Sequence, residues 1–161
     1  MLSIFDFQRT GTIDLLTVSV RLVIALLCGG IIGIERERKH RPAGFRTHIL
    51  ICLGAAMTTL TSQYIAFELK GVTDLARLGA QVIAGVGFIG AGTIIVTKRK
   101  NVKGLTTAAG LWASACMGLA IGAGFYIGAI VGCVLIILTV TVFGKIEYFI
   151  TSRSRNITIY I

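Results

Sequence analysis

The residue types that could do chemistry in this chain are concentrated in one short segment between two apolar runs. Residues 33–50 contain five basic residues, two acids, both histidines and the only proline of the chain. Neither His40 nor His48 has a partner at metal-ligand spacing, so we expect a solvated or capping role for both. No serine or cysteine stands beside a plausible base, and we therefore expect no covalent catalysis and no enzyme activity.

The charges of this segment form either a solvated turn that anchors to anionic lipid or a built site. Alternating acids are wasteful for lipid binding, and Pro42 with Gly44 specifies a definite turn. We therefore predict a structured loop whose acids clamp arginines such as Arg46, with the basic loop at 98–104 as its neighbour. The predicted cluster consists of Glu35, Arg36, Glu37, Arg46 and Thr47.

Two further patterns suggest chemistry but are better explained by packing. The segment "GVGFIGAG" at 85–92 matches G-x-G-x-x-G, yet a dinucleotide site needs a preceding strand and an acid about 20 residues on, and neither is present. No cofactor is therefore expected. The cysteines form no C-x-x-C pair and are expected to be small buried side chains. They are Cys28, Cys52, Cys116 and Cys133.

The composition of the chain indicates a membrane protein. Of its 161 residues, 55% are hydrophobic and 14% are charged, and the mean hydropathy is +0.85. That leaves too little polar surface to coat a soluble domain. The net charge of +9 could suggest nucleic acid as a partner, but nine of the sixteen Lys and Arg lie in two short segments pinned between apolar runs. Such a distribution is typical of loops next to a membrane and argues against nucleic acid.

The apolar runs define the helices that must position the charged segment. Uncharged or nearly uncharged stretches cover about 15–34, 47–67, 79–97 and 105–143. The last would be about 58 Å long as one helix, nearly twice the hydrocarbon thickness, so it must fold back. Gly122-Ala123-Gly124 is the natural turn. This divides the last stretch into spans at about 105–121 and 125–143.

The sequence therefore predicts an all-α integral membrane protein, a compact glycine-rich bundle of five transmembrane helices within residues 1–144. With five spans, twelve basic residues fall on one side and three on the other. The positive-inside rule then places the N-terminus outside and the C-terminus in the cytoplasm. Residues 145–161 become a cytoplasmic tail in which "NITIYI" resembles a first strand of a further domain that is either cut short or lacking.

Small residues are expected to hold such a bundle together. Lipid provides no hydrophobic drive between helices, so glycines that let two backbones touch become the main packing device. The same ridges are available to a second protein or to a second copy of the chain. The predicted packing glycines are Gly29, Gly33, Gly85, Gly87, Gly90, Gly92, Gly118 and Gly122.

Arg21 is the one charged residue placed inside a predicted span. An arginine there costs about 2–3 kcal/mol, so its side chain should either snorkel to the outer headgroups or find a partner. Asp14, seven residues earlier on the same helical face, is one candidate partner. Glu68 and Asp74, on the outer side, are the others.

At this level of detail the chain resembles the MgtC/SapB family of membrane proteins. The resemblance rests on "RLVIALLCGGIIGIERE" at 21–37, "AGFRTHILICLGAA" at 43–56, and two further blocks at 76–95 and 102–126. Together these blocks cover most of residues 21–126 in order. The family pattern maps onto Arg21, Glu35, Arg36, Glu37, Gly44, Arg46, Thr47, Arg77, Gln81, Gly87, Gly90, Gly92, Gly104, Thr106, Thr107 and Trp112.

The resemblance implies a bacterial inner-membrane protein tied to growth at low magnesium and, in pathogens, to virulence. It also implies a regulatory role with the membrane-embedded ATP synthase as a proposed partner, and many members carry a further soluble domain. We therefore expect a non-enzymatic regulator that contacts the lipid bilayer and another membrane protein, with a homodimer as an open alternative. The competing hypothesis is a Mg²⁺ transporter or channel component, for which the acids lie unfavourably at the span edges.

Overall fold

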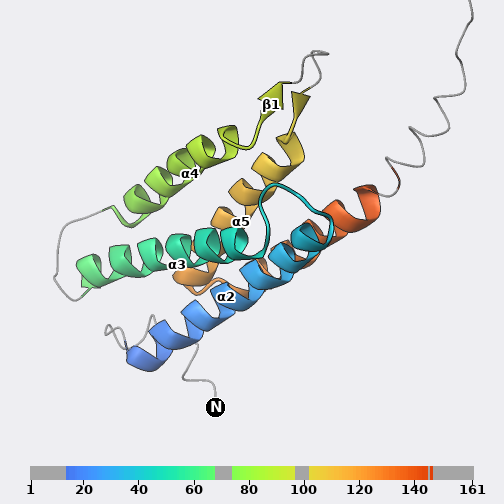
Figure 1. The fold of residues 1–161 in the computed structure, drawn as a ribbon. Coiled ribbons are helices and arrows are strands. Elements are labelled where there is room, and N and C mark those ends of the chain that lie inside the picture. The colour runs from blue at the N-terminus through green and yellow to red at the C-terminus, as the bar shows by residue number, and fades with distance from the viewer. Residues whose placement is uncertain (1–13, 68–73, 97–101, 145, 147–161) are drawn as a thin grey trace, which may run out of the picture.

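The computed structural model describes residues 14–67, 74–96, 102–144 and 146, and most of them are helical (Figure 1). The first two helices are α2, Leu15–Arg38, and α3, Phe45–Phe67. They are followed by α4, Leu75–Ala91, and α5, Leu105–Ala123. The last helix is α6, Tyr126–Leu138, which continues as the π-helix η1, Thr139–Phe143.

Four of these helices are long and apolar enough to cross a membrane. In the described part of the chain they are α2, α3, α5 and the continuous stretch Tyr126–Phe143. The fifth, α4, is apolar but has only 17 residues, about 26 Å of helix. The helical, membrane-type architecture agrees with the prediction, whereas the predicted tail strand lies outside the described residues.

The predicted third span ends earlier than expected. We expected it to reach residue 97, but α4 stops at Ala91 and Gly92 caps it by donating its N–H to the carbonyl of Phe88. The β-branched residues that follow form the short strand β1, Ile95–Val96, which pairs antiparallel with β2, Val102–Lys103. Because β-branched side chains favour extended backbone after such a cap, the fold adds a small hairpin to an otherwise helical chain.

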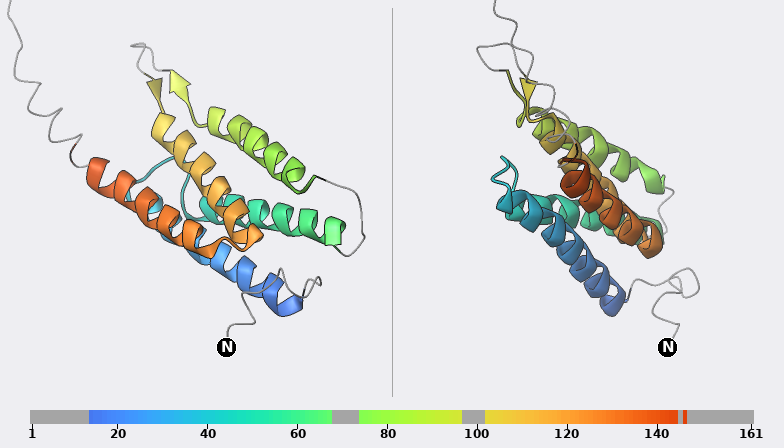
Figure 2. Two further views of the ribbon diagram at one scale, coloured as in Figure 1. Left: turned by 180° about the vertical axis from the view of Figure 1, so that it is seen from behind. Right: turned by 90° about the vertical axis from the view of Figure 1, so that its right-hand side faces the viewer.

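Helices α3 and α5 occupy the middle of the bundle. Helix α3 packs against α2, α4 and α5, while α5 also contacts α6 and α2. Figure 2 shows α6 lying along α2 and α5, with α4 on the opposite side of α5. The turn between α5 and α6 is made where it was predicted, because Gly124 takes a φ of +84°, a left-handed conformation that favours glycine.

Glycines lie where α3 approaches α2 and α5 most closely. A Cβ at Gly33 would lie 2.7 Å from the Cα of Phe45, and one at Gly29 would lie 2.9 Å from the carbonyl oxygen of His48. On the other face of α3, a Cβ at Gly122 would lie 2.5 Å from the carbonyl oxygen of Ala56. Gly118 meets the backbone of Cys52 in the same way. At these four predicted positions only a hydrogen fits between the two backbones.

The glycines of α4 behave differently from this expectation. A side chain at Gly85 or Gly87 would meet no described atom within 4 Å, and both residues are exposed. Of the four glycines predicted to pack here, only Gly90 faces another helix, with its built Cβ 3.3 Å from the Cβ of Ala108, while Gly92 serves as the cap of α4. Because α4 lies at the edge of the bundle, only one of its faces has a helix to pack against.

The cysteines are free thiols, as their spacing suggested. Cys28, Cys52 and Cys133 are buried and belong to the same apolar core, whereas Cys116 is half-buried. They fill volume between α2, α3 and α6 in the manner of small apolar side chains.

We predict that Gly118→Ala lowers the free energy of unfolding in detergent by about 1–3 kcal/mol, because the added methyl group must push against the backbone of α3. Gly87→Ala is the matched control, and it should leave stability unchanged because the same methyl group enters open space. Thermal unfolding of the two purified variants checks this. Equal melting temperatures of the two variants would show that the α3–α5 contact does not depend on the absence of a side chain at position 118.

Candidate functional site

Arg21 lies inside the bundle and makes contacts to three helices. Its side chain is 2% exposed, so of the two alternatives left open by the sequence, snorkelling or a partner, the structure shows the second. One terminal nitrogen donates to the carbonyl oxygen of Gly122 at 2.7 Å and to Oε1 of Gln63 at 2.8 Å. The Nε donates to the hydroxyl of Tyr126 at 3.2 Å. These bonds tie α2 to α3, α5 and α6 at one end of the bundle.

Two of the three predicted partners of Arg21, Asp14 and Asp74, lie elsewhere in the described structure. Asp74 accepts the N–H of Ala76 at 2.9 Å and thereby caps α4, and Asp14 is exposed at the start of α2. Glu68 lies outside the described residues. Gln63 was missed although it is the one amide in the second apolar run, because an amide gave no reason to choose it over a carboxylate.

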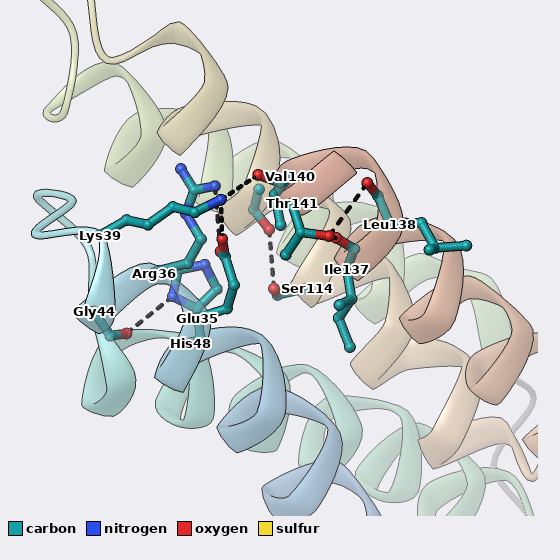
Figure 3. Close-up of polar contacts among 11 residues, drawn as sticks. Glu35, Arg36, Lys39, Gly44, His48, Ser114, Ile137, Leu138, Val140 and Thr141 are labelled. Carbon is teal, nitrogen blue, oxygen red and sulfur yellow. Dashed lines mark hydrogen bonds and ion pairs between the residues drawn. The ribbon is translucent and has the colours of Figure 1, made fainter. Parts of the chain in front are cut away.

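A second polar cluster lies at the other end of α2 (Figure 3). The carboxylate of Glu35 lies between two cations: its Oε1 is 2.5 Å from Nζ of Lys39, and its Oε2 is 3.7 Å from a terminal nitrogen of Arg36. Neither oxygen accepts a well-aligned hydrogen bond from the described residues, so ion pairing is what compensates its burial. Lys39 also donates to the carbonyl of Val140 at 2.8 Å, which joins this cluster to η1.

His48 is fully buried beside this cluster. Its Nδ1 lies 3.0 Å from the carbonyl oxygen of Gly44, so the tautomer assigned from this geometry carries its proton on Nδ1. Its Nε2 faces Gly110 of α5, and it has no hydrogen-bond partner among the described residues. The solvated alternative expected for His48 is therefore wrong, whereas His40 is exposed in the turn as expected.

Neither Glu35 nor Glu37 forms an ion pair with Arg46. Glu37 turns the other way from Glu35, and its Oε2 accepts the backbone N–H of Phe45 at 3.0 Å, which satisfies the first turn of α3. Arg46 is exposed and has no ion pair with the described residues. The predicted neighbouring loop falls mostly on residues 97–101, which lie outside the described part of the chain. The predicted cluster is thus split: Arg36 is buried and pairs with the partly buried Glu35, whereas Glu37 and Arg46 are exposed.

The remaining predicted residues lie on α4 and α5. Thr107 is buried with 4% exposure, whereas Thr106 is exposed and Trp112 is 49% exposed. On α4, Arg77 and Gln81 are both exposed. These side chains do not join either buried cluster, so the residues of the predicted functional cluster occupy several separate places.

The fold and these two clusters define the class of the protein. Arginines are buried at both ends of a glycine-packed bundle that has four helices long and apolar enough to cross a membrane, and this is the architecture of a helical membrane protein. The family model described as the MgtC family matches residues 22–149. The chain belongs to this family.

Named relatives agree with this assignment. The Escherichia coli (strain K12) protein named "Putative magnesium transporter YhiD" is 38% identical over 143 residues, which are 86% of this chain and 66% of that protein. Protein SapB of Bacillus subtilis (strain 168) is 42% identical over 127 residues, 76% of this chain and 55% of SapB. Protein MgtC of Brucella abortus (strain 2308) is 45% identical over 113 residues, 70% of this chain and 45% of that protein.

This chain spans two thirds or less of the length of these relatives. No solved structure matches it.

We predict that Glu35→Gln lowers the free energy of unfolding in detergent by about 2 kcal/mol, because it leaves the buried guanidinium of Arg36 without its compensating carboxylate. Arg38→Gln is the control, since this exposed arginine has no ion pair among the described residues and its loss should change stability by less than about 0.5 kcal/mol. Chemical or thermal unfolding of both variants measures these changes in stability. Similar losses in the two variants would contradict the prediction, because only Glu35→Gln removes the carboxylate beside the buried guanidinium of Arg36.

Proposed function

We propose that this protein is a non-enzymatic regulator in the bacterial inner membrane, with its N-terminus outside and its C-terminus in the cytoplasm. The family assignment supports a magnesium-related function, and the resemblance described above implies adaptation to low magnesium and, in pathogens, virulence. The regulator acts by contacts between its helices and another membrane protein. The observation that carries this proposal is the outward face of α4.

The outward face of α4 presents polar and small residues where a lipid-facing helix should be uniformly apolar. Its residues are spaced four, four and three positions apart, which places them in one stripe: Arg77, Gln81, Gly85 and Phe88. Phe88 is 85% exposed, and the amide of Gln81 makes no hydrogen bond with described residues. An amide facing hydrocarbon without a partner is costly, so a second protein that accepts and donates hydrogen bonds there would be stabilised.

The stripe also fits the shape of a docking helix. Gly85 lies between Gln81 and Phe88 and has no side chain. A neighbouring helix can therefore approach the backbone of α4 there, and the phenyl ring of Phe88 can pack against that helix. The membrane sector of the ATP synthase is the partner that the family resemblance suggests. A second copy of this chain is the alternative occupant, and it would give a homodimer.

We expect Gly85→Leu to abolish rescue of growth at limiting magnesium while leaving the thermal stability of the purified protein unchanged. Gly54→Leu on α3 is a matched control, because Gly54 is also exposed and also has no described atom within 4 Å of a built Cβ. It should retain full rescue. In inverted membrane vesicles, the presence of the wild type or of the Gly54→Leu variant should change the rate of ATP-driven proton pumping. The Gly85→Leu variant should leave this rate unchanged. Equal activity of both variants would remove the α4 stripe from the proposal.

The second candidate function is Mg²⁺ transport, which the name of the Escherichia coli relative favours. Magnesium binds oxygen ligands in a near-octahedral arrangement, so a path for it needs carboxylates or carbonyls at membrane depth. The described acids lie at or near helix ends: Asp14, Glu35, Glu37 and Asp74. No described acid therefore lies in the middle of a candidate span, where a path for Mg²⁺ would need oxygen ligands.

Flux measurements separate the two functions. We expect liposomes that contain the purified protein alone, loaded with a Mg²⁺-sensitive dye, to take up Mg²⁺ no faster than empty liposomes. A transporter needs no other protein to conduct, so an uptake rate that rises in proportion to the amount of protein would replace the regulatory proposal.

A further inference from the structure

A groove opens between the end of α2 and the start of α3. It is separate from the proposed docking face of α4. Its volume is about 630 Å³, and Arg38, Arg46 and Thr47 contribute its polar wall. Ile34 and Phe45 contribute its apolar wall. We name this feature the α2–α3 groove.

The groove carries an excess of positive charge. Arg38 and Arg46 are exposed, and neither has an ion pair with a described acid. The one acid on the wall, Glu37, is held across Gly44 and accepts the N–H of Phe45 at 3.0 Å. Two guanidinium groups are therefore free to bind an anion, and their planar geometry matches the oxygens of a phosphate.

The apolar wall indicates what kind of anion this is. Ile34 lies one turn before Arg38 on the same face of α2 and is 44% exposed. On α3, Leu50 lies one turn beyond Arg46, next to the groove and outside its lining, and is 67% exposed. Helices α2 and α3 thus share one arrangement. An arginine lies at the end of a candidate span, and an exposed aliphatic side chain lies one turn further into that span.

We propose that the α2–α3 groove binds an anionic phospholipid. The phosphodiester headgroup lies between Arg38 and Arg46, with the hydroxyl of Thr47 as a further donor, and an acyl chain runs over Ile34 and Leu50. A soluble phosphate would use the arginines alone and would leave the apolar wall uncovered. This inference does not rest on the regulatory function proposed above.

The test compares lipid retention by the purified full chain, using native mass spectrometry with phosphatidylglycerol and phosphatidylcholine as probes. The wild type should retain phosphatidylglycerol in preference to phosphatidylcholine. The double variant Arg38→Gln/Arg46→Gln should lose about tenfold in phosphatidylglycerol affinity, since each removes a charge-assisted contact. The control is Arg41→Gln/Lys103→Gln, which removes the same charge from two exposed positions outside the groove and should change affinity less than about twofold.

The outcomes separate the proposal from its competitors. Equal losses in the two double variants would overturn it, because the lipid would then respond only to total charge. Displacement of phosphatidylglycerol by millimolar inorganic phosphate would also overturn it, in favour of a soluble anion. Arg38→Lys/Arg46→Lys keeps the charge but not the planar donor geometry, so an intermediate affinity in this variant supports the site even if the glutamine variant unfolds.

Discussion

The close approach of α3 to α2 and α5 is the constraint on which the rest of the structure depends. Between apolar helices in lipid, association relies on van der Waals contact and hydrogen bonds, and both need short distances. Gly29 and Gly33 allow this on one face of α3, and Gly118 and Gly122 allow it on the other. The same closeness brings the carbonyl of Gly122 within 2.7 Å of Arg21. The packing of the backbones and the hydrogen bonding of the buried arginine are thus one arrangement.

At each end of the bundle, a buried cation on α2 is contacted by groups from other parts of the fold. At the Arg21 end, neutral groups from α3, α5 and α6 supply hydrogen-bond acceptors. At the Arg36 end, the carboxylate of Glu35 supplies charge, and Lys39 connects it to η1. Both arrangements join α2 to distant helices, so the polar groups add specific connections to a bundle whose packing is otherwise made of small residues.

Helix α4 differs from this central unit because it packs through only one face. Val86 and Gly90 are its buried residues, while the opposite side carries Arg77, Gln81 and Phe88 outward. A peripheral and short helix with polar groups on its free side is well placed to meet a partner without disturbing the rest of the bundle. The α2–α3 groove combines charge and apolar surface at another edge, so the two outward features are available to different occupants.

The sequence alone determined where the described helices lie along the chain and the turn between α5 and α6, because apolar run length and the glycines at 122 and 124 are local signals, but it did not determine the early end of α4 or the hairpin that follows. It also pointed to the glycine contacts of α2, α3 and α5. It did not determine where the side chains of Glu35, Arg36 and Glu37 point. Successive helical residues are rotated by about 100°, so neighbours in sequence face different surroundings, and the adjacent helices decide which face is buried.

The partner of Arg21 was likewise decided only by the tertiary structure. Gln63 and Tyr126 are 42 and 105 residues away from it along the chain, and no spacing rule connects them. The outward position of Gly85 and Gly87 has the same origin. A glycine pattern shows that a backbone can be approached closely, but only the arrangement of the other helices determines whether this chain or another molecule makes the approach.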